Sequence, residues 1–209
     1  MRVVPRLAPL LLAVTVPLLA AEPATAVTVT RHDRAGRAIT FDVRAPRVQV
    51  GWYAQLLRNA MHGDEIESVV IRVVPPSRVS RLCGGQAGSC YAGGSEVGTI
   101  TVPAGRSVET AHSLLHEYAH HIDTSRSGWR RWEEPWAQSW WTARRIDALL
   151  AAGRVSFDYD LGWGHSIPEI FAEDYVQLHM RTEFLAKWLK PPSRAVRAAL
   201  RRDLRRQPE

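Results

Sequence analysis

The sequence His116-Glu117-Tyr118-Ala119-His120 lies in the stretch that we expect to decide the fold. Ser107 supplies an N-cap, and the residues from Val108 to about Asp123 have helical character. Residues four apart on a helix lie on one face about 6 Å apart, so both imidazoles can bind one zinc ion. Glu117 can then take a proton from a zinc-bound water and pass it to a leaving amine.

A catalytic zinc site needs a third protein ligand and leaves a fourth position for water. Glu169 and Glu173 lie four apart in a segment that Pro168 opens as a helix. One carboxylate can bind the metal, and the other can accept the free ring N–H of a ligating histidine. The same spacing is common on solvated helix faces, and the upstream H-E-x-x-H favours the metal site. Asp158 and Asp160 are the alternative third ligands.

Three more polar residues of the metal helix are not expected to bind the metal. His112, one turn before His116, is expected beside a ligand or on the helix surface. His121 should point away from the metal, and Asp123 should hydrogen-bond the following turn.

The stretch from His116 to Asp123, followed by Glu169-Ile170-Phe171-Ala172-Glu173, resembles the glutamate-type zincins. It is most similar to the branch of anthrax lethal factor and Pro-Pro endopeptidase. This resemblance implies that Glu169 is the third ligand of one Zn²⁺ ion and that Glu173 contacts a ligand from behind. It also implies an α+β, zincin-like fold, in which a small twisted sheet and the metal-binding helix pack against a mainly helical C-terminal lobe.

The sequence departs from that branch at one position. The branch has a tyrosine seven residues before the ligand glutamate, where it helps to stabilise the oxyanion, and this chain has Gly162 there. The chemistry needs a hydrogen-bond donor about 3 Å from the developing charge. Tyr159 and His165 are the two candidates, and we favour His165.

The remaining sequence predicts a small sheet and several helices. Val27–Val43 should be extended, with a hairpin around Ala35-Gly36. Ser95–Val102 should form a strand at whose edge an extended substrate pairs. The other predicted elements are a strand at Ile66–Val74 and helices at Val50–Met61, Pro135–Ala152, Glu169–Met180 and Arg194–Arg206.

Five tryptophans near the middle of the chain allow two interpretations. Amphipathic packing is favoured because several of them recur at helical spacing, and a carbohydrate-stacking surface is the alternative. They are Trp129, Trp132, Trp136, Trp140 and Trp141.

Residues 1–26 have the pattern of a secretory signal peptide, with Arg2 and Arg6 before an apolar stretch and a small-residue site ending at Ala26. The apolar stretch is too short for a membrane anchor. In an oxidising compartment, Cys83 and Cys90 should form one disulfide, and thiolate ligation of a metal is the alternative.

The formal net charge is +6, and six arginines lie between 194 and 206. We therefore expect a basic C-terminal helix that contacts an anionic cell wall or stays solvated, and no nucleic-acid partner.

Together these patterns predict that residues 27–209 are one monomeric, secreted zinc endopeptidase domain that hydrolyses peptides or proteins. The alternative is a secreted, non-catalytic zinc protein that binds a cell surface or glycan.

Overall fold

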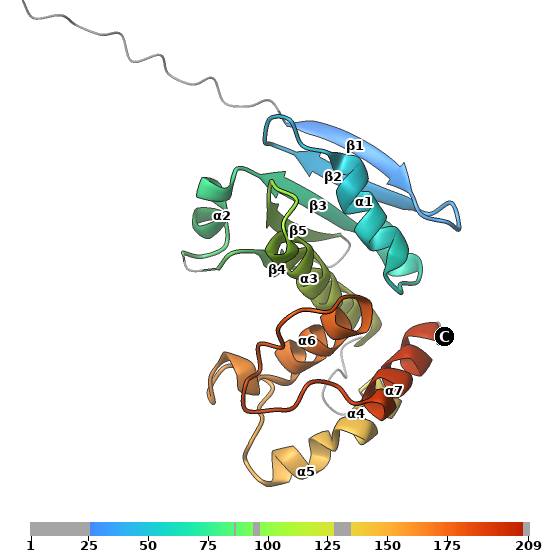
Figure 1. Cartoon of the computed structure of the whole chain (residues 1–209), viewed down its shortest axis with the longest axis vertical. Helices are drawn as coiled ribbons and strands as arrows, with labels where there is room; N and C mark the ends of the chain where they lie inside the picture. Colours follow the sequence, from blue (N-terminus) through green and yellow to red (C-terminus); the bar gives the residue numbers. More distant parts are fainter. Residues whose placement is uncertain (1–25, 86, 94–96, 128–134, 207–209) are drawn as a thin grey trace, which may run out of the picture.

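The computed structural model describes residues 26–85, 87–93, 97–127 and 135–206. Within them the fold is α+β, with a mixed five-stranded sheet above a group of helices (Figure 1). We call the sheet with its nearest helices the sheet lobe, and the part from residue 135 onward the helical lobe. Among the described helices, none combines the length and the apolar composition that a membrane span requires.

The sheet has the strand order β1-β2-β3-β5-β4. β1 (Val27–His32) and β2 (Ala38–Val43) form the predicted antiparallel hairpin, with the reversal at Gly36 in the left-handed region. β3 (Val69–Val74) is rich in β-branched residues and pairs in parallel with both β2 and β5 (Gly98–Pro103). It begins three residues later than predicted because a 3-10 turn, η1 (Asp64–Ser68), precedes it.

The expectation that the second predicted strand lies at the sheet edge is wrong. β5 pairs on its outer side with β4 (Cys90–Ala92), which runs antiparallel to it and ends the strand order. The edge strand is therefore a three-residue segment that directly follows the cystine loop.

The helices of the sheet lobe connect its strands and cover the sheet. α1 (Val50–Asn59) links β2 to β3, and α2 (Pro76–Leu82) follows β3. α3 (Val108–Ser127) is N-capped as predicted, since the Thr110 N–H donates to Ser107 Oγ at 3.1 Å. It runs to Ser127, four residues beyond the end that we expected at about Asp123.

The helical lobe contains α4 (Gln138–Arg144), α5 (Ile146–Ala151), α6 (Ile167–His179) and α7 (Arg194–Arg205). The helix predicted from Pro135 to Ala152 is divided because Arg145 takes a left-handed conformation, with φ 58°. A short turn, η2 (Trp163–His165), precedes α6.

One hydrophobic cluster runs through both lobes. The sheet contributes alternating side chains such as Ile71 and Val73, and α3 contributes Leu114, Tyr118 and Ile122, all of them buried. Phe171 and Tyr175 of α6 continue the cluster into the helical lobe. The packing of α3 against α6 thus sets the relation between the lobes.

Candidate metal centre

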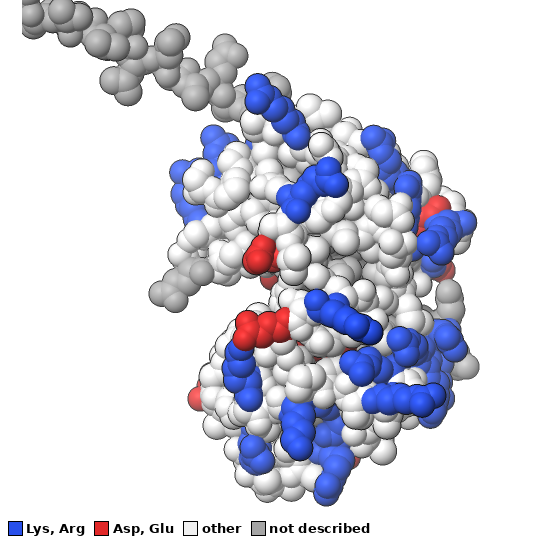
Figure 2. Space-filling model, in the orientation of Figure 1, with Lys and Arg blue, Asp and Glu red and all other residues white. Residues whose placement is uncertain are grey.

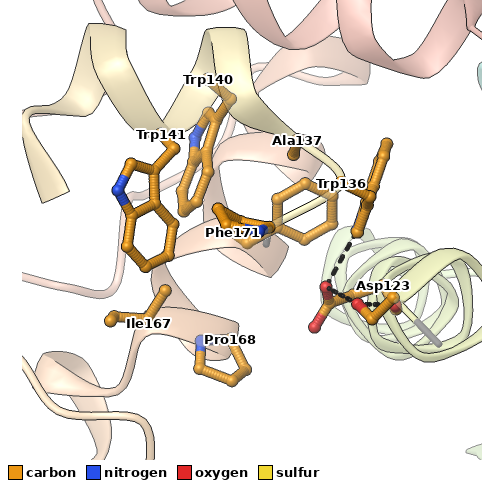
Figure 3. A pocket seen from close by; sticks show the side chains of 10 residues that line it. Asp123, Trp136, Ala137, Trp140, Trp141, Ile167, Pro168 and Phe171 are labelled. Atoms are coloured by element: carbon orange, nitrogen blue, oxygen red, sulfur yellow. Dashed lines mark hydrogen bonds between the residues drawn. The ribbon is translucent and has the colours of Figure 1, made fainter. Parts of the chain in front are cut away.

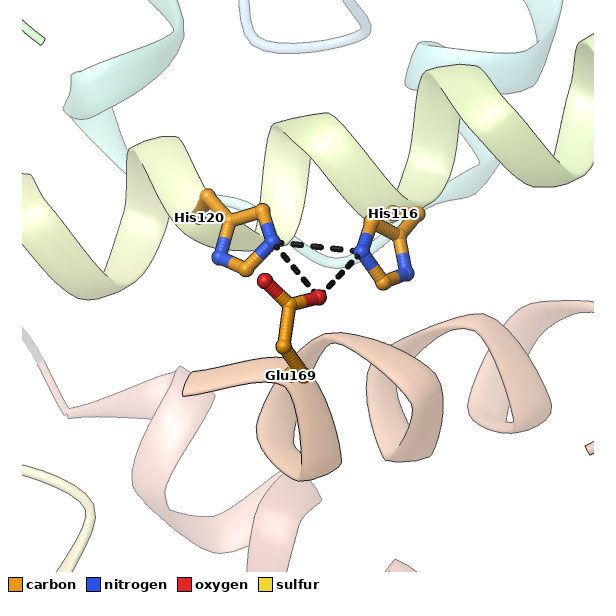
Figure 4. A group of neighbouring side chains, drawn as sticks. All are labelled: His116, His120 and Glu169. Carbon is orange, nitrogen blue, oxygen red and sulfur yellow. Dashed lines mark hydrogen bonds and ion pairs between the residues drawn. The ribbon is translucent and has the colours of Figure 1, made fainter. Parts of the chain in front are cut away.

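Three side chains from α3 and α6 converge between the lobes (Figure 4). His116 and His120 project from one face of α3, as their spacing predicts, and Glu169 approaches them from the first turn of α6. Their ligand atoms all lie within 4.8 Å of one another. His116 and Glu169 are buried, and His120 is half-buried.

The distances between these atoms fit a zinc ion. His116 Nε2 lies 2.9 Å from Glu169 Oε2 and 3.2 Å from His120 Nε2, and His120 Nε2 lies 3.3 Å from Glu169 Oε2. A tetrahedral zinc ion with bonds of about 2.05 Å places its ligand atoms about 3.3 Å apart. Two imidazole nitrogens and one carboxylate oxygen also form a donor set that suits zinc.

Glu173 lies behind the first histidine of this group. Its Oε1 atom is 3.1 Å from His116 Nδ1 and 3.2 Å from His112 Nε2, and its Oε2 atom accepts a hydrogen bond from the Leu185 N–H at 2.8 Å. The side chain is fully buried. A carboxylate on the outer ring nitrogen fixes the orientation of the imidazole and directs Nε2 towards the other donors.

The protonation of the metal-free site reflects these contacts. Burial lowers the pKa of His116, but hydrogen bonds with Glu169 and Glu173 more than offset this and raise its pKa to about 10. Burial raises the pKa of both carboxyls, yet their histidine partners lower the pKa of Glu173 to about 2 and hold that of Glu169 well below its usual range. The centre is therefore arranged around a positive charge, which a proton or a metal cation can supply.

Glu117 points into the same cleft and has a partner that the sequence analysis did not identify. The Ser89 hydroxyl donates to Glu117 Oε1 at 2.7 Å, and Glu117 as a whole residue is 8% exposed. Ser89 directly precedes Cys90, which forms the predicted disulfide with Cys83. In the sequence, the position of Ser89 beside a predicted disulfide was the only indication that it could be placed firmly. The sequence does not show towards which residues the loop turns.

The loop before α6 brings a different residue to the site than we favoured. His165 Nδ1 lies 2.8 Å from the Arg154 carbonyl, and its ring stacks on Trp188 with centroids 4.6 Å apart. His165 is therefore not among the residues that line the cleft. The Tyr159 hydroxyl instead donates to Glu169 Oε1 at 2.7 Å.

The structure does not favour the alternative third ligands, and His121 and Asp123 lie as expected. Asp158 accepts a hydrogen bond from the Asp160 N–H in an exposed turn, and neither aspartate belongs to the metal group. His121 turns away, with Nε2 2.7 Å from the Glu65 carbonyl. Asp123 accepts from the Ser127 hydroxyl, 3.0 Å from its Oδ1 atom.

The metal group opens into a cleft of about 390 Å³ between the lobes. The sheet lobe contributes Ala87, Ser89, Cys90 and Tyr91 to its lining, and the helical lobe contributes Tyr159, Trp163 and Pro168. Trp163 stacks against His116, with ring centroids 5.8 Å apart, and is 40% exposed.

The described members of the tryptophan group support the packing interpretation. Trp136 and Trp140 both meet the ring of Phe171 edge to face (Figure 3). Trp141 stacks on Phe157. Trp136 Nε1 donates to Asp123 Oδ1 at 3.0 Å, so it also connects α3 to the helical lobe. Trp129 and Trp132 lie outside the described residues, as does the predicted signal peptide up to residue 25.

Comparison of the chain with protein-family models, with curated proteins and with solved structures finds no match. The functional argument therefore rests on the geometry of the site.

Proposed function

We propose that this protein is a zinc-dependent endopeptidase. The observation that carries the proposal is the convergence of His116, His120 and Glu169 in a cleft that Glu117 also lines. A purely structural zinc site has four protein ligands and needs no carboxylate base between its histidines. This centre offers three ligands and one nearby base, which is the arrangement of a hydrolytic site.

Each residue then has a defined role. Zinc, when bound by the two histidines and Glu169, supplies a Lewis acid that polarises a carbonyl and lowers the pKa of water. Glu117 accepts the proton of the attacking water and delivers it to the departing amine. Tyr159, whose hydroxyl lies beside Glu169, replaces His165 as the donor that we assign to the developing oxyanion.

The cleft suits an extended peptide. β4 is the last strand in the sheet order, and Cys90 and Tyr91 of this strand line the cleft. A substrate that pairs with this edge through its main chain passes over the metal group, and such pairing gives affinity without selecting side chains. Apart from the metal group and Glu117, the described residues that line the cleft carry no charge, which favours uncharged substrate segments.

We also propose that the fold is zincin-like. A sheet whose edge strand lies beside the H-E-x-x-H helix, with a second helix carrying the glutamate ligand, supports the resemblance to the glutamate-type zincins. The disulfide is consistent with the proposed secretion.

The basic C-terminal helix remains the proposed contact with an anionic cell wall. α7 buries Val196, Leu200 and Leu204 and exposes most of its arginines to solvent. Figure 2 shows Lys and Arg side chains spread over the helical lobe. None of the described cleft-lining residues belongs to α7, so this charge does not form the proposed active site.

The test is the Glu117→Gln variant of the zinc-loaded protein, assayed with a diverse peptide library. We expect cleavage to fall by roughly 10²- to 10⁴-fold, the usual contribution of a general base, while bound zinc stays at the wild-type level. Glu109→Gln is the matched control, because Glu109 is an exposed glutamate in the first turn of the same helix. A zinc-loaded wild-type protein that cleaves nothing would leave the non-catalytic alternative.

A further inference from the structure

Ser89 is the neighbour of Glu117 that the proposed reaction does not yet use. Its hydroxyl donates to Glu117 Oε1 at 2.7 Å, and both side chains line the cleft. The terminal torsion of a glutamate is broad, so an unrestrained carboxylate samples many orientations. A donor on Oε1 narrows that range and keeps Oε2 as the oxygen for proton transfer.

The position of Ser89 depends on the disulfide beside it. Cys90 pairs with Thr101 as the first residue of β4, and its sulfur is bonded to Cys83, with Cα atoms 5.5 Å apart. Gly84 and Gly85 follow Cys83 with φ angles of 80° and 113°. This segment would be free to rearrange without the crosslink, because glycine has the largest conformational freedom.

The three metal ligands do not share this contact, although two of them lie on α3 with Glu117. Among the described residues, their hydrogen bonds and ion pairs join them to one another, to Glu173 and to Tyr159, and none of these partners belongs to the Cys83–Cys90 segment. Loss of the disulfide should therefore affect the base and leave the ligands in place.

We propose that Ser89 is a positioning residue for Glu117 and that the Cys83–Cys90 disulfide supports activity through it. The inference rests on the proposed peptidase function. It assigns the disulfide a role in catalysis in addition to stability.

The first experiment compares Ser89→Ala and Ser89→Thr on a fluorogenic peptide, selected from the library for cleavage by the zinc-loaded wild-type protein. We expect Ser89→Ala to lower kcat about tenfold, because a hydrogen bond to a charged group is lost, and to change KM less than about twofold. Ser89→Thr keeps the hydroxyl and should stay within about threefold of wild type. The zinc content should be unchanged in both.

The matched control is Ser80→Ala, which removes a hydroxyl that donates to the Gly85 carbonyl near the other end of the segment. It has the same chemical change but no contact with Glu117, and kcat should stay near wild type. If Ser89→Ala keeps the wild-type kcat while the wild-type protein is active, the positioning role is wrong and the peptidase proposal stands. If the wild-type protein cleaves nothing, both are wrong.

The second experiment tests the disulfide. Cys83→Ala/Cys90→Ala should lower kcat by about the same tenfold, and adding Ser89→Ala should lower it less than about twofold more, since both changes release one carboxylate. If the two decreases in kcat multiply in the combined variant, the disulfide acts independently of Ser89, and that part of the proposal is overturned.

A stability cycle gives a readout that does not need turnover. Ser89→Ala should lower the Tm of the full chain by about 2–4 °C, and by less than about 1 °C when Glu117 is already alanine. Equal shifts in the two backgrounds would show that Ser89 and Glu117 are not coupled, which contradicts the proposal.

Discussion

The sheet lobe and the helical lobe hold their paired charges at different places. In the sheet lobe, Asp33 and Asp42 pair with arginines at the margin of the sheet, and the buried pair of Glu65 with Arg126 joins η1 to the last turn of α3. In the helical lobe, Asp174 is fully buried. Its Oδ2 atom accepts hydrogen bonds from Arg144 Nε at 2.6 Å and from Trp140 Nε1 at 2.7 Å. Burial raises the pKa of Asp174, although Arg144 and Trp140 oppose the increase.

Both helices of the candidate metal centre pack apolar side chains into the core cluster, but their buried ion pairs lie at different places. On α6, Asp174 is next to Glu173 and is held by Arg144 and Trp140, whereas on α3 the paired Arg126 lies in the last turn of the helix. Substitutions that remove the contacts of Asp174 should therefore weaken zinc binding, and substitutions at the margin of the sheet should not.

The largest effect is expected from Asp174→Ala, which leaves the Arg144 guanidinium buried without its partner. Breaking a buried ion pair in this way costs about 3–5 kcal/mol of unfolding free energy. Because α6 also carries Glu169, zinc retention should fall as well. Chemical denaturation and metal analysis measure the two effects.

The control is the double variant Asp174→Leu/Arg144→Met, which removes both charges and should recover much of the lost stability. A single variant as stable as wild type would mean that the helical lobe does not depend on this pair.

The second effect concerns the contact behind His116. Glu173→Gln removes the carboxylate charge while keeping its shape, and zinc should bind about 10- to 100-fold more weakly. Competition with a chromophoric chelator measures the affinity. Glu183→Gln, at an exposed position in the same lobe, should bind zinc as wild type does. If wild type, Glu173→Gln and Glu183→Gln bind zinc with equal affinity, Glu173 does not contribute to zinc binding.

The smallest effect is expected at the margin of the sheet lobe. Burial raises the pKa of Asp33, but hydrogen bonds with His62 and Arg37 more than offset this and hold it well below its usual range. A depressed pKa stabilises the fold above the unfolded value of about 3.9, and this contribution is lost as the pH falls towards the folded pKa.

Asp33→Asn should therefore cost on the order of 1 kcal/mol at pH 7 and weaken the loss of stability below about pH 4. Zinc affinity should not change. An acid transition identical to that of wild type, measured by thermal unfolding at each pH, would contradict the assignment.

Strong local patterns made much of the fold predictable. The β-branched run of β3, the N-cap of α3 and the amphipathic pattern of α7 identify these elements. β4 was missed because three residues are too few to show an alternation. The division at Arg145 was missed because no glycine or proline marks it.

The candidate site divides in the same way. Spacing along a helix places His116 with His120 and Glu169 with Glu173, and the structure brings the four together. Loop residues have no such periodicity, so Tyr159 and Ser89 could not be placed from the sequence, and His165 was placed wrongly.

The division of the three ligands between α3 and α6 has a thermodynamic consequence. On the proposed function, a zinc ion binds the docked pair of helices far more tightly than either helix alone, so docking and binding form one linked equilibrium. A free zinc concentration 100-fold above Kd raises the free energy of unfolding by about 2.7 kcal/mol. The free energy that keeps the two lobes docked then depends on the free zinc concentration of the surrounding medium as well as on the sequence.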